Sequence, residues 1–154
     1  LISYRLKYEK LISRSSHKII KLNKNSKLNV YHYKNKLENN VNFAISKGKL
    51  SPKKSVPVRV VSTKLKNKDI LNNSNIKKSL KFLSKFKNFL LLVINNKNSV
   101  SKDNSISILR YYGIGAQIIK DLNVKNMILI SRSRKKIIGL EGFGLKIIKQ
   151  IIIK

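Results

Sequence analysis

The glycines of this chain are clustered in its last third. Five of the six fall within RYYGIGAQIIKDLNVKNMILISRSRKKIIGLEGFGL, which runs from Arg110 to Leu145. Glycine adopts positive φ, and allows a close backbone approach, at little steric cost, so such clusters are typical of strand-to-helix turns. We therefore predict that five glycines preserve the fold by shaping turns of this kind: Gly113, Gly115, Gly139, Gly142 and Gly144.

Hydrophobic periodicity predicts a mixed fold. From His17 to Thr63, short or alternating apolar segments separated by polar stretches predict antiparallel strands joined by turns. Residues 75–87 have helical spacing, and the apolar run 88–94 is typical of a strand buried on both faces. A helix over 113–122 and a buried strand over 127–130 then imply a parallel crossover. The predicted class is α/β in the mixed α+β sense, a sheet with packed helices.

The first residues follow a different pattern. Ile2, Leu6, Leu11 and Ile12 are interspersed with Lys and Arg at a spacing that suits a short amphipathic helix. A chain of 154 residues is long enough for one domain and too short for two. We expect a linker helix over residues 1–16 and a single domain over residues 17–154.

Charge and composition narrow the classes of function. The net charge of +29 favours a nucleic-acid partner, because dense basic surfaces bind phosphates. However, there are 29 lysines and only 6 arginines, with many Asn and Ile, which is typical of an AT-rich genome. No apolar run could span a bilayer and no secretory signal is present, so we expect a cytoplasmic location without membrane contact.

The glycine-rich segment resembles the C-terminal signature of the GTP cyclohydrolase II family. That signature reads R-x-Y-G-I-G-A-Q-I-L-x-D-L-G-V, then a strand, T-N-N-P-x-K and G-L-E-G-Y-G-L, and it aligns without a gap over about 36 positions. VNFAISKGKL and VPVRVVS are similar to family segments A-L-V-K-G-D-I and P-V-L-V-R-V-H-S. The resemblance covers residues 17–154 and implies the family's fold.

The start of the chain resembles part of a fused protein. LISYRLKYEKLI is similar to the linker that follows the 3,4-dihydroxy-2-butanone 4-phosphate synthase domain in fused riboflavin-pathway proteins. The resemblance implies a covalently attached upstream synthase domain, a place in riboflavin biosynthesis, and self-association as a homodimer.

The resemblance also implies a zinc-dependent hydrolysis of GTP to formate, pyrophosphate and a diaminopyrimidine. The family binds zinc through one cysteine in H-S-E-C-L-T-G-D and two in L-R-C-D-C-G, but this chain has no cysteine, and Lys64 and Thr63 replace the first cysteine and the glutamate. His17 and His32 lack the spacing of metal ligands, so we expect both on a surface or edge strand. We expect no zinc, magnesium or other cofactor.

The remaining family positions are only partly retained. The E-G-R-G-I-G-L segment is missing, and Ile108 and Arg110 stand at the family's D-x-R pair, so Arg110 has lost its acidic neighbour. Basic and hydroxyl side chains persist on the phosphate side and are candidates for anion binding. These candidates are Arg59, Ser131, Arg132, Arg134 and Lys136. We favour the alternative that they form a solvated basic loop inherited with the fold, because the guanine-selecting residues are missing.

We interpret the chain as the degenerate C-terminal half of a fused riboflavin-biosynthesis protein, with a structural or regulatory role for the attached synthase. Two alternatives stay open. One is a divergent but active GTP cyclohydrolase II, so the sequence does not decide whether the chain is an enzyme. The other is a basic nucleic-acid-binding or ribosome-associated protein.

Overall fold

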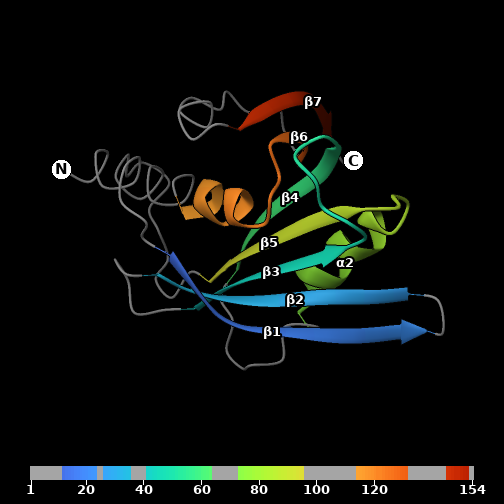
Figure 1. The fold of residues 1–154 in the computed structure, drawn as a ribbon. Helices are drawn as coiled ribbons and strands as arrows, with labels where there is room; N and C mark the ends of the chain where they lie inside the picture. Colours follow the sequence, from blue (N-terminus) through green and yellow to red (C-terminus); the bar gives the residue numbers. More distant parts are fainter. Residues whose placement is uncertain are drawn as a thin grey trace.

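The described residues of the computed structural model form a sheet-dominated domain (Figure 1). They comprise the ranges 12–23, 26–35, 41–63, 73–95, 114–131 and 145–152. The elements are β1 (Ile12–Asn23), β2 (Ser26–Asn35), β3 (Val41–Lys47), β4 (Ser55–Thr63), α2 (Ser74–Leu83), β5 (Phe89–Asn95), a helix over residues 114–121, β6 (Asn126–Ser131) and β7 (Lys146–Ile152). In these ranges the strands form one seven-stranded sheet of order β1-β2-β3-β5-β4-β6-β7.

The sheet has an antiparallel half and a parallel half. β1, β2, β3 and β5 are antiparallel to their neighbours along that row. β5, β4, β6 and β7 run parallel to one another. The prediction that residues 17–63 form only antiparallel strands is therefore wrong for β4. The chain leaves β4 through α2 and returns as β5 in the same direction, and such a crossover makes the two strands parallel.

The first strand begins within the range predicted for the linker helix. β1 starts at Ile12, so residues 12–16 are strand and not part of a linker helix; residues 1–11 lie outside the described ranges. Ile12 pairs with Asn35 of β2, and its side chain is buried in the core. Pairing with β2 provides backbone hydrogen bonds for this stretch, and that tertiary contact outweighs the local helical spacing of a few apolar residues.

The other predicted elements are confirmed with shifted ends. The apolar runs 88–94 and 127–130 lie in β5 and β6, and residues 114–121 are helical. α2 starts after Asn73, whose side-chain oxygen accepts hydrogen bonds from the backbone nitrogens of Asn75 (3.0 Å) and Ile76 (3.3 Å). An asparagine in this position satisfies backbone donors that the first helical turn leaves without partners.

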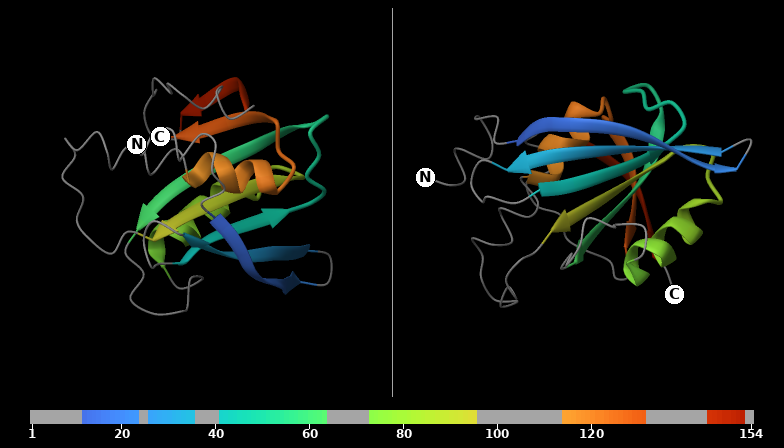
Figure 2. Two further views of the ribbon diagram at one scale, coloured as in Figure 1. Left: turned by 60° about the vertical axis from the view of Figure 1, so that its left-hand side comes forward. Right: turned by 90° about the horizontal axis from the view of Figure 1, so that it is seen from below.

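Helices on opposite faces of the sheet enclose two apolar cores (Figure 2). The helix over residues 114–121 packs with Leu90 and Leu92 of β5. α2 packs on the other face with Leu91 and Val93. Because successive strand residues point to opposite faces, β5 contributes to both cores, as a strand covered on both sides must.

A polar contact fastens the antiparallel half to the helix over residues 114–121. The Tyr33 hydroxyl and the Arg14 guanidinium both donate to the Asp121 carboxylate, at 2.7 Å and 2.9 Å. Tyr33 is fully buried, whereas Arg14 is partly exposed. Burial, together with the hydrogen bond to Asp121, raises the pKa of the Tyr33 phenol well above its usual value. Residue Asp121 is the sole acidic residue in the described ranges.

The helix over residues 114–121 ends in a left-handed residue. Asn123 has φ 64°, and its backbone nitrogen donates to the Lys120 carbonyl at 3.0 Å. The nitrogen of Val124 donates to the Ile119 carbonyl at 3.2 Å. Asparagine tolerates this conformation better than most residues, so it serves here where the family motif D-L-G-V has glycine.

Two described glycines have opposite roles. Gly48 has φ 77°, and a Cβ there would lie 2.8 Å from the Lys87 carbonyl oxygen. Gly115 lies within the helix, and its Cβ would meet Leu92 Cδ1 at an ordinary 3.7 Å. The expectation of positive φ or close approach is thus wrong for Gly115, because the helical backbone there has room for an added Cβ. Gly113, Gly139, Gly142 and Gly144 lie outside the described residues.

The two glycines give a matched pair of substitutions. Gly48→Ala is expected to lower the free energy of unfolding by about 1–3 kcal/mol, because the new Cβ is strained and collides with backbone. Gly115→Ala is expected to leave stability unchanged or to raise it by about 1 kcal/mol, since alanine favours helix. Urea unfolding measures both, and equal losses would contradict the assignment.

Titration of Tyr33 gives a pH dependence with a definite sign. The unfolded chain ionises its tyrosines near pH 10, whereas folded Tyr33 keeps its proton to higher pH, so its stabilising contribution is present below about pH 10 and is lost above it. Tyr33→Phe is expected to cost about 1–3 kcal/mol at neutral pH. The difference between variant and parent should shrink above about pH 10 in urea unfolding. A difference independent of pH would show that Tyr33 ionises normally.

Candidate functional site

The carboxyl ends of three neighbouring strands point toward one edge of the sheet. β5, β4 and β6 are parallel, and their last residues are Asn95, Thr63 and Ser131 (Figure 1). Open sheets with parallel strands bind ligands outside the carboxyl ends of those strands. The segments that hold the predicted site residues follow these ends in the chain, so the topology is consistent with a shared site at this edge.

Most of the sequence-predicted site residues lie outside the described ranges. This holds for Lys64 after β4, Ile108 and Arg110 after β5, and the basic residues after β6, which are Arg132, Arg134 and Lys136. Their roles stay predictions. The structure places two of the candidates, Arg59 and Ser131.

Arg59 lies on β4 with its guanidinium bound to neighbouring elements. Its Nε donates to the Ser79 hydroxyl of α2 at 3.0 Å, and its Nη1 donates to the Ile130 carbonyl of β6 at 3.3 Å. The buried Ser79 hydroxyl in turn donates to the Asn75 carbonyl at 2.9 Å. Arg59 therefore connects α2, β4 and β6, and these two contacts are internal to the fold.

Ser131 lies on the other face of the sheet from Arg59. It is the last residue of β6 and is buried. Ile130 packs in the core beside α2 and Leu129 packs in the opposite core, so alternation along the strand places Ser131 on the side of Leu129. The structure therefore does not bring these two candidates to one face.

A buried asparagine at the same edge was missed by the sequence analysis. Asn42 on β3 is almost completely buried, and its side-chain oxygen accepts a hydrogen bond from the Asn95 nitrogen at 2.9 Å. This contact holds the carboxyl end of β5 to β3. The available signal was one amide within the otherwise apolar run VNFAI.

The two histidines lie on the first two strands of the chain. His17 on β1 is exposed and stacks on Tyr31, with ring centroids 4.4 Å apart. His32 on β2 is half-buried, and its Nδ1 lies 2.8 Å from the Ser16 hydroxyl. Burial and the nearby charge of Lys18 lower the pKa of His32. The prediction of surface or edge-strand positions is confirmed for His17, which lies on an edge strand.

The donor set does not fit the zinc of the GTP cyclohydrolase II family. The whole chain lacks cysteine. Among the described residues, no three His, Cys, Asp or Glu side chains come together as a metal site would need. In the same part of the chain, no helix has the length and apolar character needed to cross a membrane.

Sequence comparisons agree with the resemblance at the C-terminal end. Residues 95–152 match the family model for GTP cyclohydrolase II. The chain is 52% identical over 46 residues to the riboflavin biosynthesis protein RibBA of Aquifex aeolicus. The aligned segment covers 30% of this chain and 11% of that protein. The chain is also 29% identical over 98% of its length to a 3,4-dihydroxy-2-butanone 4-phosphate synthase of Photobacterium phosphoreum, and covers 46% of that protein.

A solved structure shares the fold. The crystal structure of RibBX, a two-domain 3,4-dihydroxy-2-butanone 4-phosphate synthase from A. baumannii, matches 99% of this chain and 44% of that one, with a TM-score of 0.70 and 22% identity. The predicted mixed class is confirmed in this coarse form, with the sheet dominant. The chain spans less than half the length of these relatives.

Arg59 gives a direct test of its internal role. Arg59→Ala is expected to lower the free energy of unfolding by about 1–3 kcal/mol, because the buried Ser79 hydroxyl and the Ile130 carbonyl lose a donor. Lys77→Ala on the exposed side of α2 is the control and should change it by less than about 0.5 kcal/mol. Thermal and urea unfolding provide the measurement. If both variants changed the free energy of unfolding by similar small amounts, the structural role of Arg59 would be contradicted.

Proposed function

We propose that this chain is a GTP cyclohydrolase II-like domain of a cytoplasmic riboflavin-biosynthesis protein, that it has lost the family reaction, and that it supports an attached 3,4-dihydroxy-2-butanone 4-phosphate synthase domain. One observation carries the proposal: the similarity to proteins named as that synthase extends over almost the whole chain, in sequence and in fold. In both relatives the matched part is less than half of the protein, which leaves room for another domain.

The chemistry of the chain supports the loss of GTP hydrolysis. In the family, zinc supplies the nucleophile by lowering the pKa of its bound water. The absence of cysteine removes the thiolate ligands, and Lys64 would bring a positive charge to the metal position. Ile108 cannot accept a proton beside Arg110, so the retained arginine lacks the partner that the family uses.

The position of Arg59 supports a structural role. An arginine that binds a substrate phosphate needs guanidinium donors that face the ligand. Two donors of Arg59 bind Ser79 and the Ile130 carbonyl, so these two donors do not face a ligand. The residue thus helps to hold α2 and β6 to β4, which a supporting domain requires as much as an enzyme does.

One observation favours a second candidate, a divergent active GTP cyclohydrolase II. The match to that family covers residues 95–152, and Arg110 lies within it. This candidate requires a metal-independent hydrolysis or a set of ligands outside the described residues. Formate production from GTP distinguishes it from the supporting role.

A fusion protein tests both roles together. The synthase domain of the Photobacterium phosphoreum relative would be purified alone and with this chain fused after it. We expect the fusion to show a higher melting temperature and longer-lasting activity of the synthase, no formate release from GTP, and no zinc by elemental analysis. A domain that packs on the synthase stabilises it because binding to the native state shifts unfolding.

A Val58→Asp variant of the fusion is the control. Val58 is fully buried, and an unpaired charge there should unfold this domain and remove the stabilisation. Equal synthase stability with and without the chain would contradict the supporting role. Formate release that disappears in Arg110→Ala would establish the active candidate instead.

A further inference from the structure

A pocket opens at the amino ends of β4 and β5, the edge of the sheet opposite the candidate site. β4 begins at Ser55 and β5 at Phe89, and β3 ends next to them because Lys47 pairs with Phe89. The cavity has a volume of about 420 Å³, within the range of small-molecule sites. Its lining residues are Gly48, Lys49, Lys54, Ser55, Lys87 and Asn88.

The backbone around the pocket is held by specific contacts. The close approach of Gly48 to the Lys87 carbonyl joins the end of β3 to the segment before β5. The loop before β4 turns through a hydrogen bond from the Lys54 nitrogen to the Ser51 carbonyl at 3.1 Å. The Asn126 side chain donates to the Pro52 carbonyl at 3.2 Å and ties this loop to β6. The pocket walls are thus formed by the sheet and a fastened loop.

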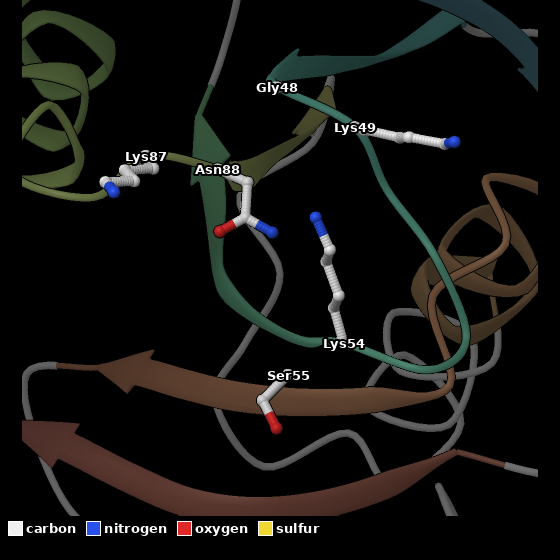
Figure 3. Close-up of a pocket in the computed structure, with 6 residues that line it drawn as sticks. All are labelled: Gly48, Lys49, Lys54, Ser55, Lys87 and Asn88. Carbon is white, nitrogen blue, oxygen red and sulfur yellow. The ribbon is translucent and has the colours of Figure 1, made fainter.

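The lining is positively charged. Figure 3 shows Lys54 extending between Asn88 and the Gly48–Lys49 segment, with the Asn88 amide nitrogen on the same side. Lys49 and Lys87 point outward on either side, and their flexible side chains can turn toward the mouth. Within the described ranges the single carboxylate, Asp121, is bound to Arg14 and Tyr33, so it does not neutralise this pocket.

We propose that this pocket binds the phosphate groups of a small phosphorylated ligand. Lys54 and the Asn88 amide supply donors that suit phosphate oxygens, and Lys49 and Lys87 add positive charge on either side of the cavity. The lining contains no aromatic side chain and no arginine, so it offers neither a stacking platform for a nucleobase nor a bidentate fork. Recognition therefore depends on the charge and size of the anion. This site is independent of the proposed function.

Pyrophosphate is the probe that tests the site. Titration into the ¹⁵N-labelled chain at low and moderate salt is expected to shift the backbone resonances of Gly48, Ser55 and Asn88 in a saturable way. The double variant Lys54→Gln/Lys87→Gln should weaken the affinity about tenfold or more, the loss of at least one charge-assisted contact. The control Lys77→Gln/Lys78→Gln removes the same charge from exposed positions of α2 and should bind like the parent.

Each outcome decides the proposal. Saturable shifts at the pocket, with an affinity that the Lys54 and Lys87 changes weaken about tenfold or more and the control changes leave intact, would establish a site for phosphate groups. Equal losses in the two double variants, or no saturation up to about 10 mM pyrophosphate, would overturn it. Shifts centred on Arg59 and Ser131 would also overturn it and would place the anion at the opposite edge. Both variants alter exposed lysines, so both are expected to fold. An unchanged dispersion of the backbone resonances verifies this.

Discussion

The structure depends on the burial of β5 on both of its faces. The side chains from Phe89 to Val93 are almost completely excluded from solvent, and β5 pairs antiparallel with β3 on one edge and parallel with β4 on the other. A strand in this position needs apolar cover on each face. The helix over residues 114–121 and α2 provide that cover, so the two cores, the crossover from β4, and the change from antiparallel to parallel pairing all meet at this strand.

Polar contacts then fasten the layers that burial brings together. Arg59 links α2 to β4 and β6, and Asn42 holds the carboxyl end of β5. Asp121 accepts hydrogen bonds from Tyr33 and Arg14, and so joins the first two strands to the helix over residues 114–121. A buried polar group of this kind destabilises the fold when it loses its partner, so a structural role is enough to account for it. An arginine at a family site position is therefore weak evidence for catalysis.

Sequence reasoning was reliable where local pattern and tertiary environment agree. Residues 89–94 and 127–130 are all apolar because both faces of β5 and β6 are covered, and such strands are recognisable from composition. It was wrong at residues 12–16 and for the direction of β4, because strand pairing involves partners distant in sequence. The same limit applied to glycine. Of the two described glycines, Gly48 outside the cluster has a positive φ, whereas Gly115 within the cluster is helical.

The sequence by itself determined which side-chain chemistry the chain can offer. A chain without cysteine has no thiolate for zinc, and Ile108 beside Arg110 has no proton acceptor, whatever the fold. Tertiary structure alone decided which of the remaining groups meet. Lys54 and Lys87 share a pocket, and Arg59 is bound by Ser79 rather than lying beside Ser131. The physical reason is that composition limits the available donors and acceptors, whereas their contacts depend on strand order, register and face, which arise from pairing between distant segments.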